Sequence, residues 1–507
     1  MTERESSDGL VVLVGAGPGD EQLATRAAAR WISHAEVIIY DRLAAAGLLG
    51  LARTDAELIY VGKSPGKAGA DQESINELLI RHARAGRLVV RLKGGDPFIF
   101  GRGGEEAEAL ADAGIGFRVV PGITAAAAAA ACAGIPLTDR RYASSVAFVT
   151  GHEADAADRI NWQALAGIDT VVIYMGVGNL DRVVSRLIQA GRDGSTPAAI
   201  VASASTPRQR VVAARLDELA GAAAAAGITP PAVAIVGKVA ALAGKLAWFE
   251  RLPLFGRTVI VTRPQGQAGQ LSRRLAELGA AAIEAPAIVI GPPEDLTAVD
   301  AALRRLGEFD WIVFTSVNGV DAFVHRCWQL GLDGRSLGSA RVAAVGPATA
   351  EGLRRNFIAP DLVPETFTTE ALAEAIRAAG ELSGRRLLLA RADIAGAGLP
   401  EALRSAGADV EDVAFYRTGR PDSLPEEAAA ALREGRVDWV TFASPSAVDN
   451  FVALLGPEAA DLLAGAKLAA IGPVTAEAVR ARGLTPTTVA RTHTIDGLVE
   501  AIVQVEA

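Results

Sequence analysis

The sequence predicts a mixed α/β fold with mostly parallel sheets, and two observations support this prediction. Short β-branched runs alternate with alanine-rich helical stretches along the whole chain, as in VVLVG, AEVIIYD, RLVVRLKGG, TVVIYMG, RTVIVTRP and DWIVFTS. Alternation of this kind is typical of parallel sheets covered by helices. The second half also repeats its own motifs, which indicates two related α/β units. A chain of 507 residues is long enough for two to four domains.

The net charge of the chain is −9, and half of its residues are apolar. This balance argues against a general nucleic-acid binder, although a local arginine pocket can still hold an anionic substrate. The two cysteines, Cys132 and Cys327, form no disulfide framework and suit a reducing cytosol. We interpret both as core residues.

We expect a cytoplasmic protein without a membrane segment or a metal site. Residues 1–9 read MTERESSDG, a polar stretch without the apolar core of an export signal, and we interpret them as a disordered tail. The alanine-rich run at 124–134 is too short to cross a bilayer. The five histidines form no ligand pattern such as HExxH.

A domain boundary is predicted near residue 255. Two bulky, proline-containing turns in LAWFERLPLFG precede a fresh strand that begins at Thr258. We therefore place one domain at residues 10–254 and another at residues 255–507.

The second domain contains an internal duplication. FDWIVFTSVNGVDAFV matches VDWVTFASPSAVDNFV, and RVAAVGPATAEGLRR matches KLAAIGPVTAEAVRA. Ser316 and Ser444 lie 128 residues apart, and VTRP and LARAD have the same offset. We expect two similar α/β units of about 125 residues, arranged as two lobes that face a cleft.

The stretch LVVLVGAGPGD, residues 10–20, joins a strand to a glycine-rich turn. A helical run follows, and Asp41 lies about two dozen residues on, so the spacing resembles a dinucleotide-binding loop. Two residues argue against a pyrophosphate. Pro18 lacks a backbone N–H, and Asp20 places a carboxylate where the phosphate would lie. A cationic ligand without phosphate, such as the sulfonium S-adenosylmethionine (SAM), fits better, but a tight turn that only packs strand on helix remains an alternative.

Further motifs follow in order, and with VGAGPGD and YDRL they make residues 10–250 resemble a uroporphyrinogen-III C-methyltransferase of the tetrapyrrole methylase family. These motifs are YVGKSPG, VVRLKGGDPFIFGRGGEE, VVPGITAA, AGIPLTDRRYA, FVTGH and VVIYMGVGNL. The resemblance implies two α/β subdomains, SAM as methyl donor, and a homodimer formed through this half.

By this resemblance, the SAM contacts fall at nine positions: Pro18, Gly94, Gly95, Asp96, Ile99, Thr124, Ala125, Met175 and Ala204. The residue types agree with this role. The glycines let backbone carbonyls approach a ligand, Asp96 accepts hydrogen bonds beside a cation, and Met175 offers soft packing for adenine. Ala204 lies in ASAST, where many relatives carry a glycine.

The resemblance also implies acid–base residues at Asp41 and Lys63, with Arg102 as a rival candidate for proton handling. Methyl transfer to a pyrrole carbon is an in-line displacement followed by loss of a proton, so alignment, water exclusion and a proton acceptor are needed. The alternative interpretations are a strand end for Asp41, a solvated loop charge for Lys63, and a structural ion pair between Arg102 and Glu105.

Residues 257–505 resemble uroporphyrinogen-III synthase, through VTRP, FTSVNGVDAF, AVGPATA, AFYRT, TFASPSAVDNF and AIGPVTA. That enzyme expels hydroxide from linear hydroxymethylbilane, inverts the last pyrrole and closes the ring. By resemblance, Tyr416 is the acid that assists departure of the hydroxyl. Four hydroxyls that follow strands are expected to bind substrate carboxylates, or else to be helix N-caps: Ser316, Thr349, Ser444 and Thr475.

Together, the two resemblances imply a bifunctional enzyme of tetrapyrrole synthesis. It would cyclise hydroxymethylbilane and methylate the product twice, at C2 and C7, giving precorrin-2 for sirohaem or cobalamin. Two alternatives remain: a methylase of a later corrin precursor, and a non-catalytic second half that is a hinged small-molecule binding module.

Overall fold

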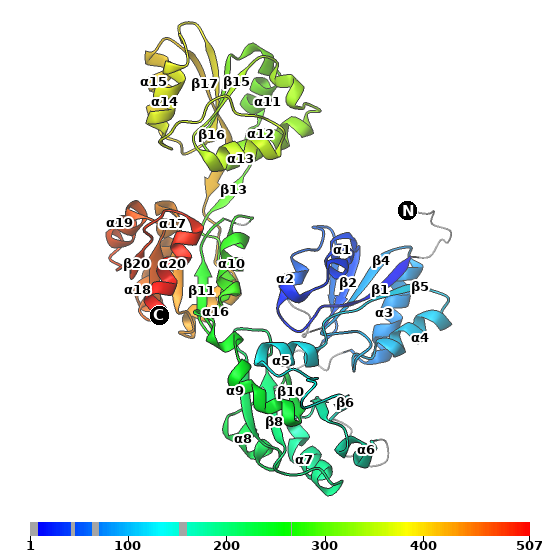
Figure 1. Ribbon diagram of the computed structural model, residues 1–507. Helices are drawn as coiled ribbons and strands as arrows, with labels where there is room; N and C mark the ends of the chain where they lie inside the picture. The colour runs from blue at the N-terminus through cyan, green and yellow to red at the C-terminus, as the bar shows by residue number, and fades with distance from the viewer. Residues whose placement is uncertain (1–8, 42–45, 63–69, 152–159, 265) are drawn as a thin grey trace. The chain divides into compact units, whose positions relative to one another are not determined.

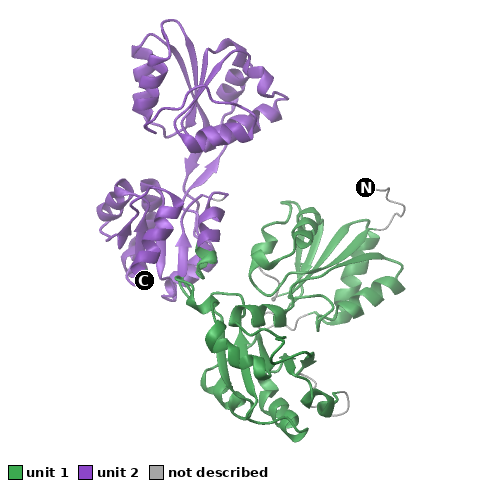
Figure 2. Cartoon of the chain, in the orientation of Figure 1, with its two compact units in different colours: residues 1–257, 275–281, 506–507 green, residues 258–274, 282–505 purple. Residues whose placement is uncertain are grey.

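The computed structural model describes residues 9–41, 46–62, 70–151, 160–264 and 266–507, and it is a mixed α/β structure, as predicted (Figure 1). The chain divides into two compact units (Figure 2). The first contains residues 1–257, 275–281 and 506–507, and the second contains residues 258–274 and 282–505. Four five-stranded sheets form the framework.

The first sheet is entirely parallel, with strand order β3-β2-β4-β1-β5. Its β-branched central strands are buried on both faces, and two apolar clusters cover the two sides, as expected of a parallel sheet between helices. Side-chain caps fix two helix starts, because Thr25 accepts from the Ala28 N–H and Asp71 from the Ser74 N–H. The elements are β1 (Leu10–Gly15), α1 (Arg26–His34), β2 (Val37–Tyr40), α2 (Ala46–Leu49), β3 (Glu57–Tyr60), α3 (Gln72–Arg84), β4 (Leu88–Lys93), α4 (Gly103–Asp112) and β5 (Gly116–Val120).

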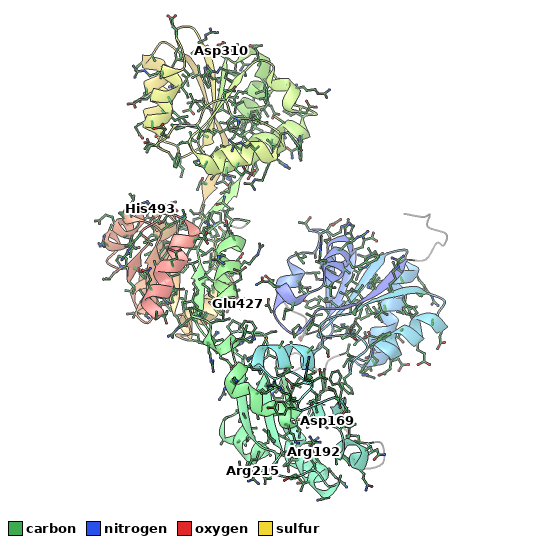
Figure 3. All side chains as sticks on the ribbon, in the orientation of Figure 1. Asp169, Arg192, Arg215, Asp310, Glu427 and His493 are labelled. Atoms are coloured by element: carbon green, nitrogen blue, oxygen red, sulfur yellow. The ribbon has the colours of Figure 1, made fainter. Side chains whose placement is uncertain are left out.

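The second sheet, β6-β7-β10-β8-β9, differs from the predicted parallel pattern. Only β6 and β7 are parallel, and the other three pairs are antiparallel because short loops connect strands such as β8 and β9 directly. At its edge, Asp169 accepts hydrogen bonds from the backbone and hydroxyls of Ser144 and Ser145 (Figure 3). The elements are α5 (Ala125–Ala133), β6 (Val146–Thr150), α6 (Trp162–Ala166), β7 (Thr170–Tyr174), α7 (Leu180–Gln189), β8 (Pro197–Ala202), β9 (Arg210–Arg215), α8 (Leu219–Ala225), β10 (Ala232–Val236) and α9 (Ala243–Leu246).

The third sheet, with order β12-β11-β18-β19-β20, defines what we call the first lobe. Strands β11, β18, β19 and β20 run parallel. The elements are β11 (Thr258–Val261), α10 (Ala268–Glu277), β12 (Ala281–Glu284), α16 (Glu426–Arg433), β18 (Trp439–Phe442), α17 (Pro445–Leu455), α18 (Ala459–Leu463), β19 (Lys467–Ala470), α19 (Pro473–Ala481), β20 (Thr488–Val489) and α20 (Ile495–Glu506).

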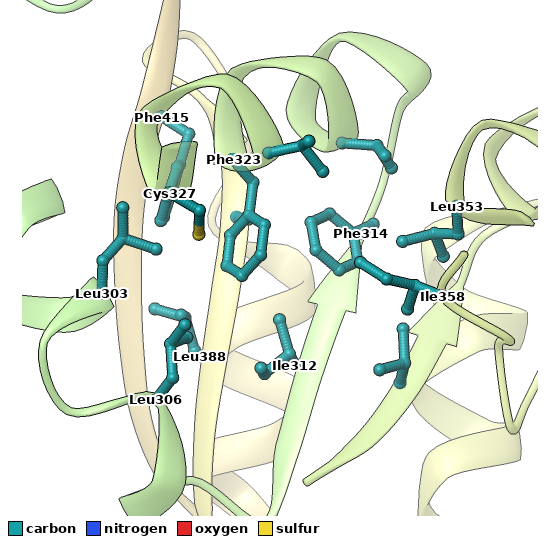
Figure 4. Packing of buried hydrophobic residues seen from close by; sticks show 14 of the residues in the cluster. Leu303, Leu306, Ile312, Phe314, Phe323, Cys327, Leu353, Ile358, Leu388 and Phe415 are labelled. Atoms are coloured by element: carbon teal, nitrogen blue, oxygen red, sulfur yellow. The ribbon is translucent and has the colours of Figure 1, made fainter. Parts of the chain in front are cut away.

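The fourth sheet, with order β13-β17-β16-β14-β15, defines the second lobe. Strands β14 to β17 are parallel, and β13 pairs with β17 in the antiparallel sense. Its core contains Phe314 and Phe323, whose rings meet edge to face at 5.2 Å, and buried Cys327 (Figure 4). The elements are β13 (Val289–Gly291), α11 (Thr297–Leu303), β14 (Trp311–Phe314), α12 (Val317–Gln329), β15 (Arg341–Ala344), α13 (Pro347–Arg355), α14 (Thr369–Ala378), β16 (Arg386–Ala392), α15 (Gly398–Ser405) and β17 (Asp409–Gly419).

The two lobes do not coincide with the two sequence repeats. The first lobe takes β11, which carries VTRP, from the first repeat, and β18 and β19 from the second. The second lobe takes β14 and β15 from the first repeat and β16, which carries LARAD, from the second. Each lobe therefore contains one copy of every motif, but it combines copies from both sequence repeats.

No helix within the described ranges combines the length and the apolar character needed to span a membrane. Both cysteines are free and buried. Burial raises the pKa of the Cys132 thiol to about 11 and that of the Cys327 thiol to about 12. Both are therefore poor nucleophiles, in agreement with their interpretation as core residues.

Candidate active sites

Glycines bring three strand ends together in the first unit. A Cβ atom on Gly15, after β1, would lie 2.5 Å from the backbone nitrogen of Gly122. One on Gly122 would lie 2.1 Å from the carbonyl oxygen of Gly95. The loops after β1, β4 and β5 can therefore meet only because these residues lack side chains.

The loop after β1 is bound to the loop after β4 by backbone hydrogen bonds. Gly17 donates to the Gly95 carbonyl at 3.2 Å, and the Gly95 N–H donates back at 2.7 Å. Gly95 has a φ of +67°, in the left-handed region that favours glycine. Asp96 extends the connection, because its carboxylate accepts from the N–H groups of Phe98 at 2.8 Å and Gly122 at 3.0 Å. The predicted cofactor residues of the two loops thus form one surface.

The start of α5 joins this surface through Tyr174, the last residue of β7. The Tyr174 hydroxyl lies 2.6 Å from Thr124 Oγ1 and accepts the Ala126 N–H at 3.0 Å. Burial raises the pKa of Tyr174, so its hydroxyl stays protonated. The rings of Phe100 and Phe148 pack against it at 5.0 and 5.7 Å. Tyr174 therefore fixes Thr124 and the first turn of α5, which begins with Ala125.

The loop after β8 lies beside the loop after β1. The Asp20 N–H donates to Ser205 Oγ at 3.4 Å, and a Cβ on Gly19 would lie 2.9 Å from Thr206 Cγ2. Ala204 lies in this loop, and with Ile99 and Ala125 it packs against one apolar cluster. The Asp20 carboxylate caps the short turn 21–23, whereas α1 itself begins later, behind Thr25.

Several residues near these loops have backbone conformations that side chains rarely adopt. Among the described residues of this part of the chain, five other than glycine have positive φ: Phe100, Arg102, Met175, Ser203 and Ser205. Conformations of this type are unfavourable and cluster at ligand sites. Met175 is also 55% exposed, which is unusual for methionine and suits packing against a flat ligand.

A buried charge network lies at the end of β2 and β4, where the sequence predicts proton handling. The Glu106 side chain is fully buried, and its Oε1 accepts from Lys93 Nζ at 2.8 Å and Arg91 Nε at 3.1 Å. Arg91 also binds Asp41 Oδ2 at 3.2 Å. Asp41 is partly exposed, so it lies at the boundary between this network and solvent.

Of the other two predicted acid–base residues, Arg102 and Lys63, the structure describes only Arg102. Arg102 forms an ion pair with Glu105 at 2.7 Å, and both side chains are more than half exposed. That geometry agrees with the structural alternative, although it leaves the guanidinium accessible to an anionic substrate. Lys63 lies outside the described residues.

In the second unit, the predicted acid and a predicted substrate residue lie together. The Tyr416 hydroxyl, on β17, is 2.9 Å from Ser316 Oγ, which lies directly after β14. Ser316 accepts the Gly319 N–H as the N-cap of α12. Either hydroxyl can donate to the other, and when Ser316 donates its proton to Tyr416, the phenolic proton is free for a substrate oxygen.

The remaining predicted substrate residues are less accessible. Ser444 is the N-cap of α17 and accepts from the Ala447 N–H, which agrees with the capping interpretation. Thr349 and Thr475 lie inside the first turns of α13 and α19, behind the N-caps Gly346 and Gly472. Both threonines are nearly fully buried. They are therefore not N-caps, and a ligand would reach the backbone N–H groups of their helices more easily than their hydroxyls.

Comparison with known proteins assigns a family to each half of the chain. Residues 10–220 match the family model "Tetrapyrrole (Corrin/Porphyrin) Methylases", and residues 269–500 match "Uroporphyrinogen-III synthase HemD". The "Porphyrin biosynthesis protein HemD" of Ruminiclostridium josui is 36% identical over 500 residues, which cover 98% of each chain. The chain belongs to the family of this protein. It is a fusion of a tetrapyrrole methylase region and a uroporphyrinogen-III synthase region, and it is an enzyme.

Further relatives match about half of the chain. The "Uroporphyrinogen-III C-methyltransferase" of Bacillus subtilis is 50% identical over 244 residues, which cover 48% of this chain and 95% of that one. The "Siroheme synthase" of Chromobacterium violaceum is 53% identical over 244 residues, 48% of this chain and about half, 52%, of the relative. The solved uroporphyrin-III C-methyl transferase of Thermus thermophilus, complexed with S-adenyl homocysteine, is 43% identical with a TM-score of 0.40, and the match covers 46% of this chain and all of that one.

Within the methylase region, the structure gathers most of the predicted SAM residues on neighbouring loops, but four residues of the sites were not predicted. These are Arg91, Lys93, Glu106 and Tyr174. Two of them carry a signal in the sequence. Arg91 and Lys93 alternate within the β-branched run VVRLK, so both charges point to one face of a buried strand, where charges need partners.

Proposed function

We propose that the chain converts hydroxymethylbilane to uroporphyrinogen III and methylates that product twice with SAM, at C2 and C7, to give precorrin-2. The observation that carries this proposal is the match over 98% of the chain to a relative that spans both regions. The name of the Bacillus subtilis relative supports uroporphyrinogen III as the methyl acceptor. The product of the second half is then the substrate of the first.

In the methylase half, the proposed roles follow from chemistry. The loops after β1, β4, β7 and β8 align the sulfonium methyl with a pyrrole carbon, which attacks while S-adenosylhomocysteine leaves. Asp41, held by Arg91 and open to solvent on one side, is suited to receive the proton that the ring then loses. Neither half of this scheme needs a metal.

The proposal is tested by mass spectrometry of the products that the whole chain forms from hydroxymethylbilane and SAM. A doubly methylated type-III product is expected. The alternative of a non-catalytic second half predicts only the spontaneously formed type-I isomer. A later corrin precursor as methyl acceptor predicts uroporphyrinogen III without added methyl groups.

Calorimetry should detect binding of SAM or S-adenosylhomocysteine and no binding of NAD. Pro18 offers no N–H to a pyrophosphate, and the neighbouring Asp20 carboxylate, which accepts the Gln22 N–H at 2.9 Å, would repel one. NAD therefore serves as the matched control ligand. Tight binding of NAD without binding of SAM would contradict the methylase assignment.

A fragment of residues 1–254 should methylate supplied uroporphyrinogen III on its own. The two sheets of the first unit have their own apolar cores, so the fragment should fold independently. Methylation is measured with labelled SAM, and circular dichroism checks folding. A folded but inactive fragment would mean that the site borrows residues from beyond residue 254. The homodimer that we expect for this half is tested on the same fragment by sedimentation.

A further inference from the structure

Arg263 is a cation whose buried Nε has no hydrogen-bond partner among the described residues. It follows β11 directly, and its side chain is half-buried. Burial lowers the pKa of the guanidinium. Burying a donor without a partner is unfavourable for folding, and an anionic ligand would supply the missing acceptor.

Arg263 lies where sheets of this topology bind ligands. The first lobe has the order β12-β11-β18-β19-β20, which is 2-1-3-4-5 in chain order. In such sheets the switch point lies between the first and third strands, and ligands bind beyond their carboxyl ends. Those strands are β11 and β18, and Val261 is in register with Thr441. The residues that follow the two strands include Arg263 and the N-cap Ser444.

Two side-chain hydrogen bonds fix the backbone where β11 and β18 end. Thr262 Oγ1 donates to the Thr441 carbonyl at 2.7 Å, and Thr441 Oγ1 donates to the Ile260 carbonyl at 3.0 Å. Both threonines are buried. This pair of bonds locks the ends of β11 and β18 together, so the backbone that carries Arg263 is preorganised. On the adjacent β19 side, the His493 ring lies against Gly472, 3.1 Å from where a Cβ on this glycine would be.

The second sequence repeat contains a matched comparison. Arg391 occupies the position 128 residues after Arg263 and also lies at the end of a strand. Its Nε and Nη2 bind the Asp412 carboxylate at 2.9 and 2.5 Å, and its Nη1 donates to the Gly396 carbonyl. Arg391 is therefore fully neutralised by the protein itself.

The first lobe retains the acid but does not use it for the arginine. Glu284 lies 128 residues before Asp412, yet its carboxylate accepts from Ser272 Oγ at 2.7 Å and is exposed. The position equivalent to Tyr416 is Ile288, a core residue. The two lobes therefore differ at equivalent positions. The second lobe has the Tyr416 phenol, and the first lobe has Arg263, a cation without a partner among the described residues.

We propose that Arg263 binds one carboxylate of the tetrapyrrole substrate at the switch point of the first lobe. The inference rests on the proposed synthase function, whose linear substrate and ring product carry eight carboxylates. A guanidinium suits this task because it can bind a carboxylate through two parallel N–H bonds. Arg263 then anchors the substrate, while the second lobe provides the proton for the leaving hydroxyl.

The test compares Arg263→Met with Arg273→Met in the full chain. Arg273 lies exposed on α10 of the same lobe and controls for the loss of one positive charge. Arg263→Met should raise KM for hydroxymethylbilane by about ten- to a hundredfold, the range for a lost hydrogen bond to a charged group, with kcat changed by less than about threefold. Arg263→Lys should recover part of the loss, and Arg273→Met should leave KM unchanged.

Thermal unfolding separates binding from a structural role. Because no described residue pairs with Arg263, Arg263→Met should leave Tm unchanged or raise it by about 2–4 °C. Arg391→Met should lower Tm, since it leaves Asp412 unpaired. A folded Arg263→Met variant with unchanged KM would overturn the inference, and so would a Tm decrease matching that of Arg391→Met. Failure of the wild-type chain to form uroporphyrinogen III would instead overturn the proposed synthase function.

Discussion

Replacing Tyr416 with phenylalanine is expected to slow ring closure by about ten- to a thousandfold, as for the loss of a general acid. Only the hydroxyl is removed, and that hydroxyl lies 2.9 Å from Ser316 Oγ in a nearly fully buried position. The ring itself stays, so packing should be preserved. The rate is measured as formation of uroporphyrinogen III from hydroxymethylbilane, after subtraction of the spontaneous type-I product.

Two controls make this result specific. Methylation of supplied uroporphyrinogen III should be unchanged in Tyr416→Phe, because that chemistry belongs to the other unit. Ser316→Ala removes the partner of Tyr416 and the N-cap of α12 together, so it should lower the rate less but reduce stability by about 1 kcal/mol. An unchanged synthase rate in Tyr416→Phe would show that Tyr416 is only a core residue. Loss of both activities would indicate misfolding.

The strand and helix pattern could be predicted because burial and periodicity are local properties of the sequence. Runs such as VVLVG and DWIVFTS became buried strands β1 and β14, and both cysteines became core residues. The antiparallel character of the second sheet was not foreseen, since strand direction depends on how loops reconnect and not on the composition of the strands. The domain boundary near residue 255 stays a prediction.

The sequence repeats alone could not predict that each lobe combines motifs from both repeats. Duplicated sequence shows that two units have similar local structure, but either copy of β11 or β16 fits the same place in a sheet. Only the observed strand order shows that β11 lies beside β18 and that β16 lies beside β14. For this reason the divergence of Arg263 from Arg391 became visible only in three dimensions.

The candidate sites were partly predictable for a related reason. Glycine-rich turns can be recognised in the sequence, and the loops with Gly95, Thr124 and Ala204 lie near one another. Long-range polar partners carry no such local signal. Tyr174 reaches Thr124 across 50 residues, and Gln72 reaches Glu106 across 34. The SAM and substrate roles of these residues stay predictions.

Replacing Glu106 with alanine is expected to destabilise the methylase half by about 3–5 kcal/mol, the range for removing one partner of a buried ion pair. Glu106 Oε1 accepts from Lys93, Arg91 and Gln72 at 2.8, 3.1 and 3.3 Å, in a position without solvent exposure. Without this carboxylate, Lys93 loses its ion-pair partner among the described residues, whereas Arg91 keeps Asp41 and the backbone carbonyls of Ile39 and Leu92. Urea unfolding of the 1–254 fragment gives the free energy, and Glu105→Ala, on the exposed neighbour, is the matched control with little expected change.

The pH dependence of Glu106→Gln identifies which cation the carboxylate compensates. Burial and the nearby Arg91 lower the pKa of Lys93 below its usual 10.5, while Glu106 acts in the opposite direction. Glu106→Gln should therefore lower this pKa further. Between the lowered pKa of the folded state and the usual 10.5, the unfolded chain then binds more protons than the folded one. Stability therefore rises with pH in this window, and the deficit of the variant shrinks in alkaline solution. Adding Lys93→Met should recover part of the lost stability, because it removes the unpaired charge. The stability deficit of Glu106→Gln could instead stay constant with pH and not be relieved by Lys93→Met. That result would mean that Glu106 mainly compensates the charge of Arg91, and that it thereby positions Asp41.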